Sequence, residues 1–351
     1  MENYNFEKLT KLLDESSGQL YGKAVCAVGK NGKRVFSHSV NCAMDSMFDL
    51  ASVSKILTGT MVLQLIGEGK LSLDDSLDTL FQTEALGPVT KERFKSITLK
   101  QLLTHSSGLP AWFPFYTQEG SFWDALEVAL NKYPVEQGMV YSDLGFMLLG
   151  KAIRAASGLT LSQSLNLLNG ELGTSFEYNP KNPAACVETE RGNRIEEGMC
   201  AERGLPFKNF RSHETNMRGE VNDGNAFYFW HGVAGHAGVF GIAKDLLTLG
   251  ELYLNQGKAN GKKLIPASLV EKSTVDYGAG RGLMWALSDI YIAGFGHTGF
   301  TGTSIYLCRE TGSAAVILTN RLVIEPAPDL RPLRTEAHRL IYEGGLGSGL
   351  M

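Results

Sequence analysis

The sequence predicts an α+β protein in which an antiparallel sheet, built from both ends of the chain, carries a mainly helical insertion between them. Two observations lead to this prediction. Strand-like runs with short turns between them occur near the N-terminus and again near the C-terminus. The central part instead places apolar residues at helical spacing, with Gly and Pro between the segments. The predicted sheet domain therefore comprises residues 1–60 and 235–345, and the helical domain comprises residues 61–234.

The N-terminal elements are predicted to be a helix and a hairpin. From about Asn5 to Asp14, apolar residues recur at helical spacing and indicate an amphipathic helix. The runs AVCAVG and RVFSHSV flank the dipeptide Asn31-Gly32, which tolerates the positive φ angles of a type I′ turn. Two antiparallel strands are therefore expected here.

The C-terminal part contains four strand-like runs: GLMWALS, YIAGFGH, SIYLCRE and SAAVILTN. The last two flank a Thr311-Gly312 turn, and three more antiparallel strands are expected from this region. The closing segment DLRPLRTEAHRLIYE has a helical pattern of apolar residues, so it is expected to pack back on the sheet.

The middle of the chain is predicted to be mainly helical. The helical segments are TLKQLLTH, SFWDALEVAL, DLGFMLLGKAIRAAS and LSQSLNLL. From Gly173 to His231 the chain is rich in Asn, Gly, Pro and charged residues, which is typical of a long loop. Loops of this length in compact domains are usually lids over functional sites or are disordered, and we favour a lid over the site.

Composition narrows the classes of function. Of 351 residues, 43% are apolar and 20% are charged, as in a globular protein with a sizeable core. The net charge of -4 and the absence of a basic run argue against nucleic acid or an anionic membrane surface as partner. The polar N-terminus does not resemble a secretory signal, so a cytoplasmic location is expected. The cysteines are scattered, lack C-x-x-C spacing and are expected to be buried small hydrophobes: Cys26, Cys42, Cys186, Cys200 and Cys308.

Ser52 and Lys55 stand in the otherwise apolar stretch LASVSKILTGT, three residues apart and thus on one face of a helix. A serine hydroxyl is a weak nucleophile at neutral pH and needs a nearby base. Because apolar neighbours lower the pKa of a lysine by desolvation, Lys55 is predicted to be neutral and basic. If the helix begins near Ser52, its free amides stabilise negative charge on a substrate carbonyl. Taken alone, the pair also fits a helix cap and a lysine that extends to solvent.

Tyr141-Ser142-Asp143 follows a turn at Gly138 and opens the predicted helix DLGFMLLGKAI. A phenol at this junction can project into a cleft and shuttle a proton between the serine and a leaving group. Taken alone, the pattern also fits a core tyrosine beside an aspartate helix cap.

His297-Thr298-Gly299 ends the strand-like run YIAGFGH. A glycine at this position lets a substrate backbone approach closely, and the next amide, that of Phe300, is a candidate oxyanion donor. Taken alone, this pattern also fits a turn.

Together and in this order, the three patterns resemble the serine β-lactamase and penicillin-binding protein (D-alanyl-D-alanine peptidase) superfamily. The resemblance is to its class C-like branch, which includes carboxylesterases and muropeptide amidases. Further similar blocks are LLTHSSGLP, YSDLGFMLLGKAI and GVAGHAGVFGIAKDLLTLG, so the resemblance covers nearly the whole chain. The matching motifs are Ser52-Val53-Ser54-Lys55 for Ser-x-x-Lys, Tyr141-Ser142-Asp143 for Tyr-x-Asn, and His297-Thr298-Gly299 for Lys-Thr-Gly.

The resemblance implies a β-lactamase/transpeptidase-like fold, with an α/β domain beside a helical one. It also implies a covalent acyl-enzyme on Ser52, with Lys55 and Tyr141 acting as a coupled base and acid. The amides of Ser52 and Phe300 are implied to hold the oxyanion. No metal and no cofactor are implied.

Two positions depart from the family's motifs. His297 replaces a lysine, which removes a permanent cation that helps β-lactamases and peptidases to recruit a substrate carboxylate. Asp143 replaces an asparagine, and an anion in contact with Lys55 should raise the pKa of that lysine and oppose its role as a free base. Our hypothesis is that His297 or solvent offsets the charge of Asp143. In either case, weak β-lactamase activity is expected.

Two histidines and an aspartate outside these motifs are further candidates for structural or site roles. His105 in LLTHSSG is interpreted as a structural loop residue. His236 lies in the Gly-rich segment GVAGHAG, which in the resembling amidase-like branch lies near the site, so His236 is a candidate for lining the cleft. Asp223 is a further candidate for the same rim. The spacing of His236 and Asp223 fits no standard metal-ligand pattern, and no metal site is predicted.

The leading functional hypothesis is a serine hydrolase that cleaves an ester or amide through an acyl-enzyme. One form is a carboxylesterase for short acyl esters. Another is an amidase or D-peptidase for muropeptides in cell-wall recycling, which GEVNDGNA and GVAGHAGVFG favour because similar segments recur in that branch. From a different class, a penicillin- or acyl-peptide-binding module without turnover remains open, although the retention of Ser52, Lys55 and Tyr141 argues against it. A small-molecule substrate is expected, with no nucleic acid or membrane partner, and a monomer or homodimer.

Overall fold

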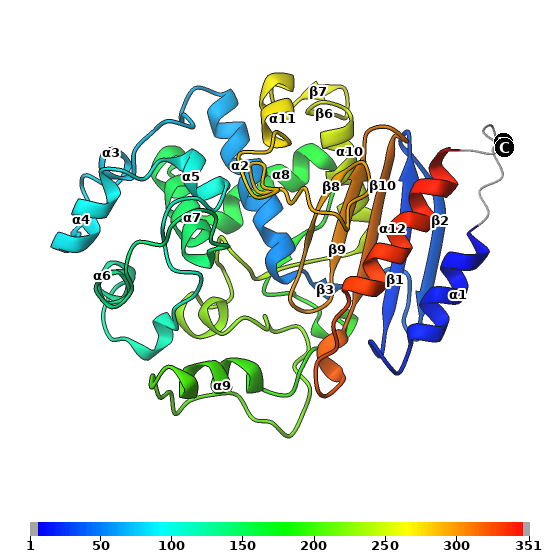
Figure 1. The fold of residues 1–351 in the computed structure, drawn as a ribbon, viewed down its shortest axis with the longest axis horizontal. Helices are drawn as coiled ribbons and strands as arrows, with labels where there is room; N and C mark the ends of the chain where they lie inside the picture. Colours follow the sequence, from blue (N-terminus) through cyan, green and yellow to red (C-terminus); the bar gives the residue numbers. More distant parts are fainter. Residues whose placement is uncertain (1–5, 347–351) are drawn as a thin grey trace.

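A five-stranded antiparallel sheet joins the two ends of the chain (Figure 1). The computed structural model describes residues 6–346. The strand order is β2-β1-β10-β9-β8, so the N-terminal hairpin pairs with the last C-terminal strand. The expected α+β fold and the expected hairpin are thereby confirmed. The strands are β1 (Ala24–Lys30), β2 (Lys33–Val40), β8 (Phe295–Thr298), β9 (Ser304–Cys308) and β10 (Ser313–Thr319).

Helices cover both faces of this sheet. Alternate residues of β10 point to opposite sides: Val316 faces the core beneath α10, whereas Ile317 faces the core beneath α1 and α12. In Figure 1, α1 and α12 lie side by side on one face of the sheet, as their mutual contacts require. The predicted N-terminal helix begins near Asn5, which lies outside the described residues. The helices are α1 (Glu7–Ser16), α10 (Ala243–Leu254) and α12 (Arg331–Leu346).

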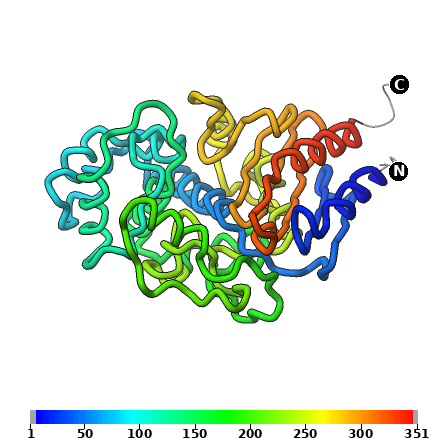
Figure 2. Tube along the Cα trace, turned by 60° about the horizontal axis from the view of Figure 1, so that its bottom comes forward, coloured from blue at the N-terminus to red at the C-terminus, as the bar shows by residue number. Residues whose placement is uncertain are grey.

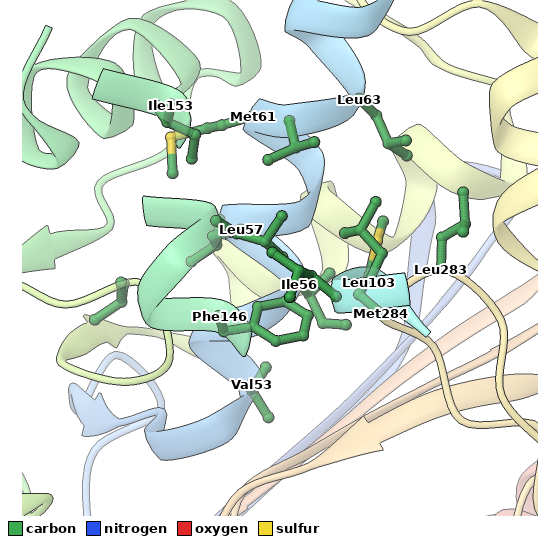
Figure 3. Packing of buried hydrophobic residues seen from close by; sticks show 14 of the residues in the cluster. Val53, Ile56, Leu57, Met61, Leu63, Leu103, Phe146, Ile153, Leu283 and Met284 are labelled. Atoms are coloured by element: carbon green, nitrogen blue, oxygen red, sulfur yellow. The ribbon is translucent and has the colours of Figure 1, made fainter. Parts of the chain in front are cut away.

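The run GLMWALS is not a strand, although its composition predicts one. Met284 has a φ of 59°, and its amide donates a hydrogen bond to the carbonyl of Leu103 in the helical part. Leu283 and Met284 are buried near α2, as Figure 3 shows. Burial of these side chains in the core between the two parts of the molecule therefore outweighs the strand propensity of the segment.

The helix α2 (Ser54–Gly67) is the centre of the helical part. It is buried on nearly all sides, which agrees with its apolar residues being distributed around the whole helix. Figure 3 shows Leu57 and Ile56 of α2 beside Phe146 of α7. The helices α5 to α8 include the four predicted segments. The helices of this part are α3 (Leu77–Leu80), α4 (Pro88–Phe94), α5 (Leu99–Leu103), α6 (Phe122–Lys132), α7 (Asp143–Ser157) and α8 (Leu161–Leu172).

The segment from Gly173 to His231, predicted as a loop-like lid, contains a helix and is anchored in a small sheet. The sheet has the order β3-β5-β4, and β3 leads directly to Ser52. The segment runs along one side of the molecule, green in Figure 2. The remaining elements are β3 (Phe48–Asp49), β4 (Glu177–Tyr178), α9 (Arg194–Glu202), β5 (Val239–Gly241), β6 (Lys258–Ala259), β7 (Lys262–Lys263) and α11 (Ala267–Ser273), with short helical turns at 51–53, 115–117, 183–185, 225–229 and 321–323.

Gly235 allows the backbone before β5 to pass between α2 and α7. Its carbonyl accepts a hydrogen bond of 2.7 Å from the hydroxyl of Thr58. A Cβ atom at Gly235 would lie 2.1 Å from the carbonyl oxygen of Phe146, so any side chain here displaces the backbone. The neighbouring carbonyl of His236 belongs to the site described below.

Gly235→Ala is expected to lower the free energy of unfolding by ~1–3 kcal/mol or more, because the added methyl group overpacks a rigid backbone contact. Gly170→Ala in α8 is the matched control, since a Cβ atom there meets nothing within 4 Å. The control should raise the free energy of unfolding by roughly 0.5–1 kcal/mol, as glycine is costly inside a helix. Urea denaturation measures both, and equal effects of the two substitutions would contradict the close packing at Gly235.

Candidate active site

Ser52 is held by a constrained turn between β3 and α2. Ala51, which precedes it, has a φ of 46°, a conformation that costs free energy for a residue other than glycine. The carboxylate of Asp49 stabilises this turn by accepting the amide of Ala51 at 2.9 Å and that of Asn222 at 2.7 Å. Burial raises the pKa of Asp49 to about 6, partly offset by these two amides. The turn therefore fixes Ser52 at the start of the α2 helix.

Two threonines attach the Ser52 turn to the loop between β8 and β9. The hydroxyl of Thr301 donates to the carbonyl of Asp49 at 2.8 Å, and that of Thr303 donates to the carbonyl of Leu50 at 2.9 Å. These bonds bring the Phe300 segment to Ser52, as the predicted oxyanion site requires. In the described part of the chain, the amides of Ser52 and Phe300 donate no backbone hydrogen bond, so both are free to stabilise a substrate oxygen.

The side chain of Lys55 is fully buried, and its ammonium nitrogen contacts three oxygen atoms. Its Nζ atom lies 3.0 Å from Oγ of Ser52, 2.9 Å from the carbonyl oxygen of His236 and 2.7 Å from Oδ1 of Asp143. The contacts with Ser52 and His236 are hydrogen bonds, and the contact with Asp143 is an ion pair. The structure thus brings the predicted serine and lysine into direct contact, with Asp143 beside them.

The neutral Lys55 expected from its apolar neighbours is wrong, whereas the raised pKa expected from contact with Asp143 is confirmed. Burial opposes the charge on the lysine, as predicted, but the carboxylate of Asp143 and the phenol of Tyr141 outweigh burial. The pKa of Lys55 is therefore raised above its ordinary value, and Lys55 is an ammonium at neutral pH. The hypothesis that His297 or solvent offsets Asp143 is also not needed, because Lys55 itself pairs with that carboxylate.

Tyr141 is positioned by its neighbours in the chain and by two cations. Its ring lies 4.4 Å from that of His105, whose Nδ1 accepts the amide of Ser142 at 3.0 Å. Nζ of Lys55 lies 5.0 Å from the centre of the Tyr141 ring, and the guanidinium carbon of Arg281 lies 5.2 Å from it. The Tyr141 hydroxyl is buried without a hydrogen-bond partner among the described residues. His105 is thus structural, as interpreted, and it orients the tyrosine.

His297 is a neutral hydrogen-bond acceptor toward the site. Burial, with the cations of Arg281 and Lys55, holds the pKa of His297 well below its ordinary value. Nδ1 lies 2.8 Å from the carbonyl oxygen of Thr298, which only accepts, so Nδ1 carries the proton. Nε2 is then the free acceptor, and no described residue donates to it. His297 therefore cannot replace the cationic lysine of the family's motif.

The positive charge of the Ser52 cavity comes from arginines that the sequence did not predict as site residues. A cavity of about 320 Å³ opens beside Ser52 and includes Tyr141 and the predicted run 297–300. Arg281, Arg321 and Arg334 line the same cavity, with Asp329 as the carboxylate among its lining residues. They lie in separate segments and match no motif, so no signal in the sequence alone assigns them to the site. The full lining is Ser52, Tyr141, Arg281, Ala286, His297, Thr298, Gly299, Phe300, Arg321, Asp329, Leu330 and Arg334.

Comparison with known proteins identifies the family of the chain. The family model described as Beta-lactamase matches residues 9–339. The chain belongs to the Beta-lactamase family. The predicted superfamily and the prediction of a β-lactamase-like hydrolase are thereby confirmed at the level of the family.

Among curated relatives, this member of the Beta-lactamase family is 28% identical to the N-acetylmuramyl-L-alanine amidase of Bacillus subtilis (strain 168), over 88% of this chain and 77% of the other. It is 27% identical to a proposed D-alanyl-D-alanine carboxypeptidase of Escherichia coli (strain K12), over 90% and 79%. Solved structures with the same fold include a penicillin-binding protein homolog from Caulobacter crescentus, with a TM-score of 0.72, 17% identity and 97% of both chains covered. A class C β-lactamase from Rhodobacter sphaeroides matches with a TM-score of 0.69, 18% identity and coverage of 96% and 97%.

His236 was predicted to line the cleft, but it is not among the residues that line the Ser52 cavity. It lies behind that cavity. Its side chain is fully buried, with Nε2 2.9 Å from Oδ1 of Asp223, while its carbonyl accepts from Lys55. Asp223 is thus also behind the site and not at its rim. Among residues 6–346, no group of three or more His, Cys, Asp or Glu side chains is arranged to hold a metal ion.

The segment 173–231 contributes no lining residue to the Ser52 cavity, in contrast to the lid expected from its composition. It contacts the site from behind, through Asp223 and through Asn222, whose amide donates to Asp49.

No single described helix is long and apolar enough to cross a membrane, although α7 and α8, bent by 78°, pass that test as a pair.

Asp143→Asn is expected to move the basic limb of the pH profile of kcat/KM to lower pH. The Asp143 carboxylate helps to raise the pKa of Lys55, and without it burial favours loss of the proton. Below both pKa values the ammonium is present in both proteins, so the difference appears only as pH rises. Asp329→Asn is the control, because it changes a cavity carboxylate that forms no ion pair with Lys55. A gain of activity at neutral pH in Asp143→Asn would contradict a functional ammonium.

Proposed function

We propose that this protein is a serine amidase or peptidase that cleaves an amide bond next to a free carboxylate, through an acyl-enzyme on Ser52. One observation carries the proposal. The cavity beside Ser52 is also lined by two arginines, Arg281 and Arg334, each with a buried N–H group that finds no acceptor among the described residues. A carboxylate is the partner that such donors select.

Arg281 and Arg334 are the groups that we propose bind this carboxylate. Nη1 of Arg281 and Nε of Arg334 are buried without an acceptor among the described residues. Burial lowers the pKa of Arg281, and it lowers that of Arg334 to about 10, so both remain cations at neutral pH. Arg321 has another role, since it donates to the carbonyls of Phe300 and Pro328 and thereby supports the oxyanion loop.

In the proposed acylation, the Ser52 oxygen bonds to the amide carbon as its proton passes to the oxygen of Tyr141, which acts as the base. Lys55 holds the serine oxygen, and with Arg281 it stabilises negative charge on the tyrosine. The carbonyl electrons move to oxygen, which accepts the amides of Ser52 and Phe300. The C–N bond then breaks, and Tyr141 returns the proton to the leaving nitrogen.

Deacylation reverses these roles with water as the nucleophile. Tyr141 takes a proton from the water as the oxygen bonds to the acyl carbon, and it returns the proton to Ser52 as the ester bond breaks. The unprotonated Nε2 of His297 accepts a hydrogen bond from the substrate or from this water. The names of the relatives support an amide substrate, since one is an amidase and another is a proposed carboxypeptidase. Weak activity toward β-lactams remains our expectation.

Ser52→Ala is expected to reduce turnover of p-nitrophenyl butyrate, N-acyl-D-alanyl-D-alanine and N-acetylmuramyl-L-alanine by at least about 10³-fold, because no nucleophile remains. Mass spectrometry of the wild type during turnover should show the added acyl mass, and Ser52→Ala should show none. The two amide substrates distinguish the peptidase from the muramyl amidase. Undiminished turnover in Ser52→Ala would overturn the acyl-enzyme, and tight substrate binding without wild-type turnover would instead support a binding module.

Arg281→Gln is expected to raise KM for N-acyl-D-alanyl-D-alanine by about tenfold or more, since a charged hydrogen bond to the carboxylate is lost. KM for the C-terminal carboxamide of the same substrate should change little. Arg309→Gln is the matched control, because its guanidinium also lies over an aromatic ring, 5.1 Å from that of Phe295, but outside the cavity. Equal rises in KM for the acid and the carboxamide would contradict carboxylate recognition while leaving the acyl-enzyme intact.

A further inference from the structure

A second cavity, of about 350 Å³, is lined by residues in the range 147–154 of α7, which follow Asp143 in the same helix. Its walls come from α7, the beginning of α8 and the segment 230–235, and none of its lining residues lines the Ser52 cavity. Figure 1 shows where α7 and α8 lie in the helical part of the molecule. The volume is in the range of sites for small organic ligands, about 300–1,000 Å³.

The body of the cavity is apolar. Met147 and Leu161 line it from the helices, and Trp230, Val233 and Ala234 line it from the connecting segment. Backbone at Gly150 and Gly235 supplies further surface without side chains. An aromatic ring or a short hydrocarbon chain fits this lining, because burial of apolar surface is its main source of binding free energy.

The charged side chains that line the cavity are both cations, and no carboxylate lines it. The charge of Glu84 acts on Lys151 from outside this lining. The side chains of Lys151 and Arg154 line it, and neither forms an ion pair or hydrogen bond with another residue in the range 6–346. Nζ of Lys151 lies 5.0 Å from the centre of the Trp230 ring and 5.4 Å from that of Phe122. Burial lowers the pKa of Lys151, so the charge is partly withdrawn from water.

Trp230 supplies a third hydrogen-bond donor beside Lys151 and Arg154. The indole Nε1 of Trp230 is buried and has no acceptor among the described residues. An indole N–H can only donate, and Lys151 and Arg154 also only donate. The unsatisfied polar groups around this apolar cavity are therefore donors and cations, which a carboxylate complements and a cationic or neutral ligand does not.

We propose that this cavity binds a small amphipathic carboxylate, with an apolar body against Trp230 and Leu161 and its carboxylate on Lys151 and Arg154. This site is separate from the proposed function and does not depend on it. A bound molecule lies against Gly235, one residue before the His236 carbonyl that holds Lys55.

Calorimetric titration of the full chain with 4-phenylbutyrate, and with 4-phenylbutanol as its uncharged counterpart, tests the proposal. The acid is expected to bind at one saturable site in the Arg281→Gln background, in which carboxylate binding in the catalytic cavity is weakened. Lys151→Met should weaken binding of the acid by about tenfold or more and leave that of the alcohol nearly unchanged. Arg154→Gln, at an exposed position where folding is not at risk, should weaken it in the same direction.

Lys100→Met is the matched control, since Nζ of Lys100 also lies over an aromatic ring, 4.9 Å from that of Tyr277, but lines a different cavity. It should leave binding of 4-phenylbutyrate unchanged. Three results would overturn the proposal: no saturable binding of the acid, equal affinity for the acid and the alcohol, or equal losses in Lys151→Met and Lys100→Met. Binding that disappears in Arg281→Gln also overturns it, because the acid then binds only beside Ser52.

Discussion

The buried ammonium of Lys55 is the interaction on which the rest of the site depends. Moving such a charge out of water costs several kcal/mol unless every donor is satisfied in good geometry. The three oxygen atoms around it come from the turn 51–53 before α2, from the start of α7 and from the segment before β5. The charge can therefore be buried only if these elements meet at one point. The apolar packing of α2 in Figure 3 and the absence of a side chain at Gly235 make that meeting possible.

The need to compensate the buried charge of Lys55 explains why Asp143 and His297, the two departures from the family's motifs, occur together. Asp143 supplies a full negative charge to Lys55, so the lysine is fixed as an ammonium and not as a free base. His297 beside it is neutral, because a further cation next to Lys55 and Arg281 is electrostatically unfavourable. The positive charge that a lysine brings to the motif elsewhere comes here from arginines on other segments. Arginines therefore supply positive charge in this cavity, where the family's motif has a lysine.

Behind the site, the buried carboxyl groups of Glu196 and Asp223 differ in protonation. Burial raises the pKa of Glu196 to about 8, and the charge of Asp223 adds to this, so Glu196 is largely protonated at neutral pH. Burial also acts on Asp223, but His236 and Lys55 lower its pKa and keep it ionised. Only one of the two neighbouring carboxyl groups then carries charge, as expected when like charges share a site of low polarity. This arrangement fixes His236, and through its carbonyl it fixes Lys55.

The sequence by itself determined the fold class, the hairpin, most helices and the contact between Ser52 and Lys55, because these follow from local periodicity, turn chemistry and short spacing. It did not determine that GLMWALS packs as core and not as a strand, since its environment is made by distant residues such as Leu103. Only the tertiary structure decided the ionisation of Lys55, the place of His236 and the presence of Arg281 and Arg334 in the cavity. Each of these depends on the distance between charges that are far apart in the chain, and electrostatic energy depends on distance in space and on burial, which no pattern along the sequence records.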